Sequence, residues 1–308
     1  MSKKIAITLG DPSSIGAEIT HKALASLNFD MNRFVLIGNQ KSYGKIEDGV
    51  DFIDIKSDEI FIPGKPSAKS GEVAFRSVEK AIELAKSGMV DAIVTAPISK
   101  AAINLAGYSF SGHTEIFDKY LSGDAQMLFV AGDFRVLLLT RHVPIKDVPS
   151  RLKRDFIFIE VQRLHQSLQK LGMESPRIAL CGLNPHAGED GLLGREELEE
   201  FLPAIKELKA KGMQIEGPFA ADMLFSKAAN SFKKSQKQPY DCYVATYHDQ
   251  GLCAVKSIDL ANTVNVTIGL EVLRTSPAHG TAFDIAGQNI ASSGSMQQAI
   301  VFAYNHLK

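Results

Sequence analysis

Short apolar runs alternate with amphipathic stretches along the whole chain, and this alternation constrains the fold more than any other feature of the sequence. Strands alternating with helices are typical of α/β proteins with a largely parallel sheet. Gly132-Asp133 separates two strand-like runs and indicates a hairpin, so we expect a mixed sheet. The predicted strands are Ile5–Leu9, Phe34–Gly38, Val90–Thr95, Met127–Ala131, Arg135–Thr140, Arg177–Leu183, Asp241–Val244 and Val264–Ile268. The predicted helices are Ala17–Leu27, Gly71–Ser87, Asp155–Leu171, Glu196–Lys211 and Ser295–Leu307.

The composition excludes several classes of protein. The 308 residues are 45% hydrophobic and 22% charged, which suits a globular protein of one large domain or two lobes. The net charge of -1, with no basic stripe, argues against a nucleic-acid partner. No apolar run approaches the roughly 18 residues of a membrane helix. The start of the chain does not resemble a signal peptide, and the three cysteines form no Cys-x-x-Cys, so we expect a cytoplasmic protein with reduced thiols.

Four histidines, His113, His142, His186 and His248, follow four different predicted strands. Ligands of open α/β sheets bind beyond the carboxyl ends of the strands, so these histidines are expected to converge if the strands share one edge. Imidazole suits zinc and other borderline divalent metals, and three such ligands would leave a position open for substrate. Because the histidines are far apart in the chain, proton transfer or ordinary loop hydrogen bonding also stays open for each. Within Ala245–Gly251, Gly251 is expected to let the backbone turn after His248.

Three further segments carry groups that could hold a ligand. The loop Gly10–Gly16 follows the first strand and could cradle an anion on free N–H groups. Lys256 and Arg274 lie around the strand that contains Asn265, and such cations hold phosphate or carboxylate, although two solvated surface cations are the alternative. In His279–Gly287, Asp284 could accept the hydroxyls of a ribose, or it could be an ordinary acidic residue in the first turn of a helix.

Taken together, these segments resemble the 4-hydroxythreonine-4-phosphate dehydrogenase family of the pyridoxal phosphate pathway. The last motif also resembles the adenosine loop of isocitrate and isopropylmalate dehydrogenases. One departure is Ser13-Ser14, where the family usually has Ala-Gly. The matching pieces run in family order over nearly the whole chain: Gly10-Asp11-Pro12, Ile15-Gly16, Thr95-Ala96-Pro97, Gly112-His113-Thr114-Glu115, His142-x-Pro144, Leu183–Glu189, Tyr247–Gly251, Asn265-x-Thr267-x-Gly269-Leu270, Arg274-Thr275-Ser276 and His279–Ala282.

The resemblance implies a two-lobed, three-layer α/β/α fold like that of isocitrate and isopropylmalate dehydrogenases. The first lobe, on the cofactor side, would be residues 1–110 plus 270–308. The second lobe, on the metal, substrate and dimer side, would be residues 111–269. The active site would lie in the cleft between the lobes and at the subunit interface of a homodimer.

The resemblance also implies the members of the site. A divalent zinc, magnesium or cobalt ion would be held by His142, His186 and His248, with ligands drawn from both subunits. The catalytic candidates are Lys256, Asp249 and Asp222, with the two aspartates near the metal. The implied substrate contacts are His113, Thr114, Lys256, Asn265 and Arg274. NAD or NADP would bind at His279, Gly280, Thr281, Ala282, Asp284 and Ile285.

The implied reaction is metal-dependent, NAD(P)-linked oxidation of 4-phosphooxy-L-threonine. Loss of CO2 then gives 3-amino-2-oxopropyl phosphate for pyridoxine 5'-phosphate biosynthesis. The carboxylate of Asp284 would repel a 2'-phosphate, so we expect NAD to be preferred. Two alternatives stay open: a paralogous dehydrogenase of phospho-threonate or phospho-erythronate, and a non-catalytic protein that binds phosphate or metal.

Overall fold

The computed structural model describes residues 3–110 and 112–307, and the chain divides into two compact units. Unit 1 comprises Met1–Ala125 and Val264–Lys308, and unit 2 comprises Gln126–Thr263. Residues 112–125 and 264–269 thus pack with unit 1, whereas the sequence placed them in the second lobe; residue 111 lies outside the described residues. The physical reason is local, because residues 264–270 pair with the following strand and Ile116 and Phe117 join the core of unit 1.

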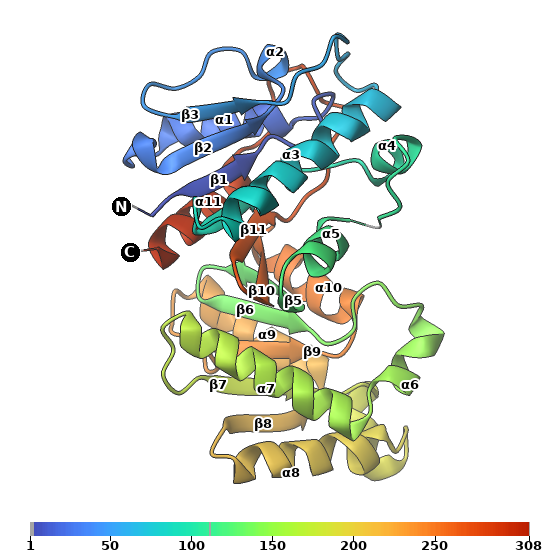
Figure 1. Ribbon diagram of the computed structural model, residues 1–308. Helices are drawn as coiled ribbons and strands as arrows, with labels where there is room; N and C mark the ends of the chain where they lie inside the picture. The colour runs from blue at the N-terminus through green and yellow to red at the C-terminus, as the bar shows by residue number, and fades with distance from the viewer. Residues whose placement is uncertain (1–2, 111, 308) are drawn as a thin grey trace. The chain divides into compact units, whose positions relative to one another are not determined.

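Unit 1 contains a sheet with the strand order β3-β2-β1-β4-β11-β10. All neighbours are parallel except β10 and β11, which are antiparallel. Helices α1 and α11 lie on one face and α3 lies on the other (Figure 1). The strands are β1 (Ile5–Thr8), β2 (Phe34–Gly38), β3 (Asp51–Asp54), β4 (Ala92–Thr95), β10 (Val264–Leu270) and β11 (Leu273–Pro277). The helices are α1 (Gly16–Ser26), α2 (Gln40–Tyr43), α3 (Ala68–Lys86), α4 (Lys100–Leu105), α5 (His113–Tyr120) and α11 (Gly294–His306).

The helix α3 shows why these residues fold as they do. Ser67 and Ser70 form a capping box that satisfies the first N–H groups of the helix. Val73, Val78 and Ile82 follow at helical spacing and are buried in the core of the unit. The predicted amphipathic helix over 71–87 is therefore confirmed, with one further turn at its start.

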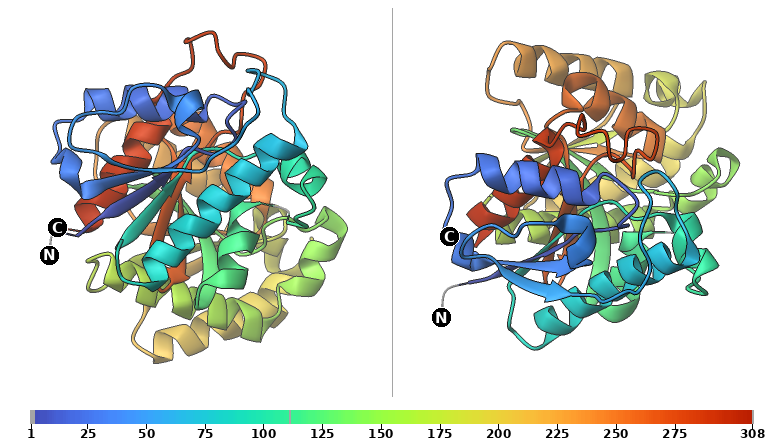
Figure 2. Two further views of the ribbon diagram at one scale, coloured as in Figure 1. Left: turned by 45° about the horizontal axis from the view of Figure 1, so that its top comes forward. Right: turned by 90° about the horizontal axis from the view of Figure 1, so that it is seen from above.

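Unit 2 contains the strand order β5-β6-β9-β7-β8. The predicted hairpin is confirmed, since β5 and β6 are antiparallel, and β6, β9, β7 and β8 are mutually parallel. Helices α9 and α10 cover one face, and α7 and α8 cover the other (Figures 1 and 2). The strands are β5 (Gly123–Ala131, which starts at the end of unit 1), β6 (Phe134–Leu138), β7 (Arg177–Cys181), β8 (Gln214–Phe219) and β9 (Cys242–Ala245). The helices are α6 (Val148–Arg151), α7 (Arg154–Lys170), α8 (Leu202–Ala210), α9 (Ala221–Lys233) and α10 (His248–Asp259).

Each unit is thus a three-layer α/β/α structure, as the family resemblance implied, with the mixed sheet that the sequence predicted. No described helix is long and apolar enough to cross a membrane. One local expectation is wrong: Gly251 does not turn the backbone but lies inside α10. A Cβ at that position would lie 2.5 Å from Leu138 Cδ2 and 3.0 Å from Ala245 Cβ, so the glycine allows close packing of α10 on the sheet.

Candidate active site

In unit 2, the parallel strands β6, β9, β7 and β8 are neighbours, so their carboxyl ends lie at one edge of the sheet. The residues that follow these four strands are, in the same order, His142, His248, His186 and Asp222. The expected common edge is therefore confirmed for three of the four histidines. His113 belongs to unit 1 instead, where it begins α5.

The geometry around His248 suits a metal ligand. Its Nδ1 lies 2.6 Å from Asp249 Oδ1, which leaves Nε2 as the ring nitrogen available to a metal. Metal-binding histidines commonly use their second nitrogen in this way, because the carboxylate fixes the ring orientation. The rings of His142 and His248 have centroids 5.6 Å apart. Their donor chemistry therefore fits a borderline divalent metal.

One chain does not bring a complete set of ligands together. Among residues 3–110 and 112–307, no three His, Cys, Asp or Glu side chains lie close enough to hold one metal ion. His186 lies on an exposed loop after β7, and Asp222 is exposed at the start of α9. The metal set His142, His186 and His248 thus remains a prediction, in which ligands come from two subunits.

Unit 1 contains a buried arginine whose guanidinium donates to hydroxyls, and to no carboxylate among the described residues. Arg274 on β11 is 2% exposed, and its guanidinium donates to the hydroxyls of Thr95, at 2.6 and 3.1 Å, and Thr267, at 3.2 Å. Burial lowers the pKa of Arg274 to about 9, and the negative charge of Glu115 offsets part of that shift. A buried cation of this kind is suited to an anion that accepts its remaining donors.

Several buried polar atoms in unit 1 have no hydrogen-bond partner among the described residues, and three of them bear on the predicted site. These three are His113 Nε2, Asn265 Oδ1 and His279 Nε2. Buried polar atoms are nearly always hydrogen-bonded, so an unpaired atom indicates a place for a ligand or water. All three belong to residues that the sequence assigned to the substrate or the cofactor. Thr114, the next residue of α5, is buried as well.

His113 is expected to make the protein sensitive to acid. Burial and the charge of Arg274 hold the pKa of His113 well below its ordinary value of 6.5. Below pH 6.5 the unfolded chain therefore binds a proton that the folded chain does not, and the stability of the fold falls by up to about 1.4 kcal/mol per pH unit. The free energy of unfolding, measured by urea titration, should fall less steeply with acid for His113→Gln. Parallel wild-type and variant curves would contradict this.

The predicted cofactor loop follows β11 and is anchored to the loop after β1. The backbone carbonyl of Thr281 accepts a hydrogen bond from the N–H of Ile15 at 3.2 Å. His279 Nδ1 lies 3.0 Å from the carbonyl oxygen of Gly280, which places its proton on Nδ1 and leaves Nε2 as the unpaired acceptor. Asp284 is exposed, and Ala282 has a φ of 43°. The role of the loop in cofactor binding stays a prediction.

The expectation that the Gly10–Gly16 loop cradles an anion is wrong for the N–H groups of residues 13–16, because each of them already donates to an oxygen atom of the protein. The N–H of Ser13 donates to the Asp11 carboxylate at 2.9 Å, and that of Gly16 donates to the Ser14 hydroxyl at 3.0 Å. The N–H groups of Ser14 and Ile15 donate to backbone carbonyls. The Ser14 hydroxyl also donates to the Asp11 carbonyl, so one of the two serines that depart from the family sequence makes hydrogen bonds within the loop.

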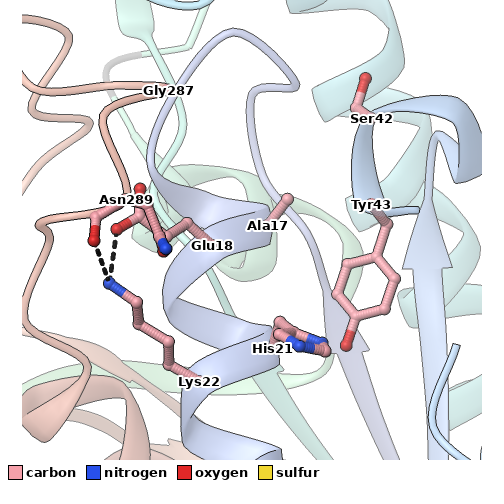
Figure 3. Close-up of a pocket in the computed structure, with 8 residues that line it drawn as sticks. All are labelled: Ala17, Glu18, His21, Lys22, Ser42, Tyr43, Gly287 and Asn289. Atoms are coloured by element: carbon pink, nitrogen blue, oxygen red, sulfur yellow. Dashed lines mark hydrogen bonds and ion pairs between the residues drawn. The ribbon is translucent and has the colours of Figure 1, made fainter. Parts of the chain in front are cut away.

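A pocket of about 240 Å³ lies in unit 1 between α1, α2 and residues 287–289 (Figure 3). Its charged groups are already paired: Lys22 Nζ lies 2.7 Å from Glu18 Oε1, and His21 Nδ1 lies 2.8 Å from Glu47 Oε1. Lys22 also donates to the Asn289 carbonyl. Because these charges satisfy one another, we assign this pocket no ligand.

Comparison with known proteins decides the family. Residues 3–303 match the family described as pyridoxal phosphate biosynthetic protein PdxA. The chain belongs to the PdxA family. A 4-hydroxythreonine-4-phosphate dehydrogenase from Zymomonas mobilis is 39% identical, with 98% of this chain and 95% of the relative covered. A D-threonate 4-phosphate dehydrogenase from Cupriavidus necator is 38% identical, with 96% and 95% covered. The crystal structure of 4-hydroxythreonine-4-phosphate dehydrogenase from Klebsiella pneumoniae is 33% identical, covers both chains fully and has a TM-score of 0.86.

The similarity to PdxA family members supports an oxidoreductase, since these relatives are named as dehydrogenases. It also agrees with the predicted fold class. The structure adds two positions that the sequence did not single out, Thr95 and Thr267, whose hydroxyls hold Arg274. Both threonines lie in motifs that the chain shares with the family, and this was the feature of the sequence that could have identified them. Lys256, predicted for both substrate binding and catalysis, is exposed on α10 of unit 2.

Proposed function

We propose that the protein oxidises the C3 hydroxyl of 4-phosphooxy-L-threonine with NAD(P) as acceptor, and that loss of CO2 gives 3-amino-2-oxopropyl phosphate. The reaction would belong to pyridoxine 5'-phosphate biosynthesis and would have the specificity of 4-hydroxythreonine-4-phosphate dehydrogenase, EC 1.1.1.262. Membership of the PdxA family supports this proposal.

The observation that carries the proposal is the buried Arg274. Its guanidinium is held in place by two hydroxyls, and the unpaired buried atoms of His113 and Asn265 belong to the same unit. Across the sheet, Arg274 is directly opposite Thr267, and Asn265 lies two residues before Thr267 on the same face. A phosphate dianion would accept from Arg274, and a bound substrate would satisfy the orphaned polar atoms.

The donor chemistry of His142, His186 and His248 fits a divalent metal, and His279 to Ile285 form the proposed NAD(P) loop. When bound, the metal would lower the pKa of the substrate hydroxyl and stabilise negative charge, and NAD(P) would accept the hydride. Arg274, with His113, Thr114 and Asn265, would hold and orient the substrate.

Proton transfer needs one more group. Lys256, Asp249 and Asp222 are the candidates. Because the Asp249 carboxylate is hydrogen-bonded to His248, we assign Asp249 to the orientation of that ring and Lys256 to the proton of the C3 hydroxyl.

A second function, oxidation of D-threonate 4-phosphate, is supported almost equally. The D-threonate 4-phosphate dehydrogenase of Cupriavidus necator is 38% identical to this chain. Steady-state kinetics with both substrates at saturating NAD separate the two. We expect the larger kcat/KM with 4-phosphooxy-L-threonine. A larger value with D-threonate 4-phosphate would assign the chain to the second function, while the anion site at Arg274 would serve both.

We expect NAD to be preferred over NADP by about 10²-fold in kcat/KM, because an exposed carboxylate at Asp284 would repel a 2'-phosphate. Asp284→Asn should narrow this preference, while its turnover at saturating NAD stays close to that of the wild type. Equal kcat/KM for NAD and NADP in the wild type would refute the role of Asp284.

We also propose a homodimer that completes the active site. Seven large apolar side chains of unit 2 are exposed, and four of them lie on the segments that follow β6, β7 and β8, which suits a surface covered by a second copy. These four are Ile145, Leu192, Leu193 and Met223. Light scattering on the purified protein measures the mass, and a monomer at micromolar concentration would overturn this part.

A further inference from the structure

The loop that carries His186 has an unusual backbone. Six consecutive residues, 186–191, have positive φ angles, of 54°, 51°, 85°, 44°, 52° and 93°. Only two of them, Gly188 and Gly191, are glycines. A left-handed conformation costs an L-residue about 1–2 kcal/mol, so the four other residues of this run need strong support from their surroundings. Strain of this kind concentrates at functional sites.

The support comes from a buried carboxylate beneath the loop. Glu197 is 2% exposed and begins a π-helical turn, Glu197–Phe201. Its Oε1 accepts hydrogen bonds from the backbone N–H groups of Leu183 and Asn184, both at 2.8 Å. Its Oε2 accepts from the side-chain amide of Asn184 at 2.9 Å. The carboxylate thus fixes the segment that leads into His186.

The same carboxylate also fixes the segment after His186. A Cβ on Gly188 would lie 2.7 Å from Glu197 Oε2, so the centre of the left-handed turn closes directly over the carboxylate. His186 itself is exposed, whereas Gly188 is buried. Glu197 therefore contacts the chain on both sides of the histidine, and the three N–H donors stabilise its buried charge.

We infer that Glu197 is a positioning residue for His186. It holds the left-handed turn in place before any metal binds, so that the imidazole is already presented at the carboxyl edge of the unit 2 strands. The inference rests on the proposed function, in which His186 is a metal ligand. A glutamine at 197 would place an NH₂ group against the amide donor of Asn184, so only a carboxylate satisfies all three donors.

The test is the affinity of the full-length protein for Zn²⁺ alone, measured by competition with a chromophoric chelator. Glu197→Gln is expected to weaken binding about 10-fold, at the lower end of the effect of groups that orient metal ligands. Glu199→Gln is the matched control, because Glu199 is exposed in the same helical turn and pairs with Arg195. It should leave the affinity unchanged. Wild-type affinity in Glu197→Gln would overturn the inference.

His186→Ala distinguishes this inference from the proposed function. If His186→Ala binds zinc like the wild type, the proposed metal set fails. If His186→Ala weakens binding and Glu197→Gln does not, only the positioning role fails. In the double variant, Glu197→Gln should add nothing to His186→Ala, because the histidine that it positions is gone. A further 10-fold loss in the double variant would show a general effect and contradict the inference.

If Glu197→Gln does not fold, Gly188→Ala carries the same test. Its added Cβ would push against the carboxylate while Glu197 stays intact, and alanine is strained at a φ of 85°. We expect weaker zinc binding with an unchanged circular dichroism spectrum. Unchanged zinc affinity in this folded variant would overturn the positioning role.

Discussion

Arg274→Met is expected to lower kcat/KM for 4-phosphooxy-L-threonine by about 10³-fold, because truncating one partner of a buried, hydrogen-bonded charge pair costs about 4 kcal/mol. The reason lies in the site itself. Arg274 is 2% exposed and its guanidinium is held by Thr95 and Thr267. A mobile cation on the surface therefore cannot take its place as the partner of the phosphate. Arg274→Lys keeps the charge but loses the planar fork, and an intermediate loss is expected.

The unphosphorylated substrate is the control for this prediction. With 4-hydroxy-L-threonine, Arg274→Met should change kcat/KM little, since no phosphate is present to lose its partner. A melting temperature close to that of the wild type would show that Arg274→Met is folded, so that its loss of kcat/KM reports on the binding site. An equal loss with both substrates would mean that Arg274 does not bind the phosphate.

His248→Ala is expected to abolish tight binding of Zn²⁺ and to lower turnover by at least about 10³-fold, because it would remove one of three ligands from a catalytic metal. Asp249→Asn should cost about 10-fold in zinc affinity, since it removes the partner that orients the His248 ring. Chelator competition measures the affinity and steady-state assays measure turnover.

His165→Ala provides the matched control, because His165 lies in the same unit on α7, away from the carboxyl edge of the strands. It should bind zinc like the wild type. Wild-type zinc affinity in His248→Ala would remove this histidine from the metal set and, with it, the proposed use of the carboxyl edge of unit 2.

The position of the unit 2 histidines at one edge of the sheet could be predicted from the sequence, because it depends on a local rule. Polar residues directly after buried strands lie at the carboxyl edge, and parallel pairing of β6, β9 and β7 brings that edge together. The strands β3, β8 and β11 were not predicted, and for β3 and β8 the reason is equally local. β3 is a short edge strand with Asp51 and Asp54 at its ends, and β8 contains Gly-Pro.

Other features depend on long-range contacts that no local pattern contains. Thr95 and Thr267 look like ordinary strand residues, and only the pairing of β4, β11 and β10 brings their hydroxyls to Arg274. Glu197 stands among Glu196, Glu199 and Glu200, a run that resembles a solvated helix face. It is buried beneath a left-handed turn, which Gly188 and Gly191 alone do not predict.

The most direct test mixes the purified protein with 4-phosphooxy-L-threonine and NAD, with and without a chelator, and follows NADH absorbance together with release of CO2. We expect equal amounts of NADH and CO2, and loss of both when the chelator removes the metal. Addition of zinc, magnesium or cobalt ions should restore the reaction. NADH formation that persists unchanged in the chelator would contradict the metal-dependent mechanism. Absence of NADH with every added metal would contradict the proposed reaction itself.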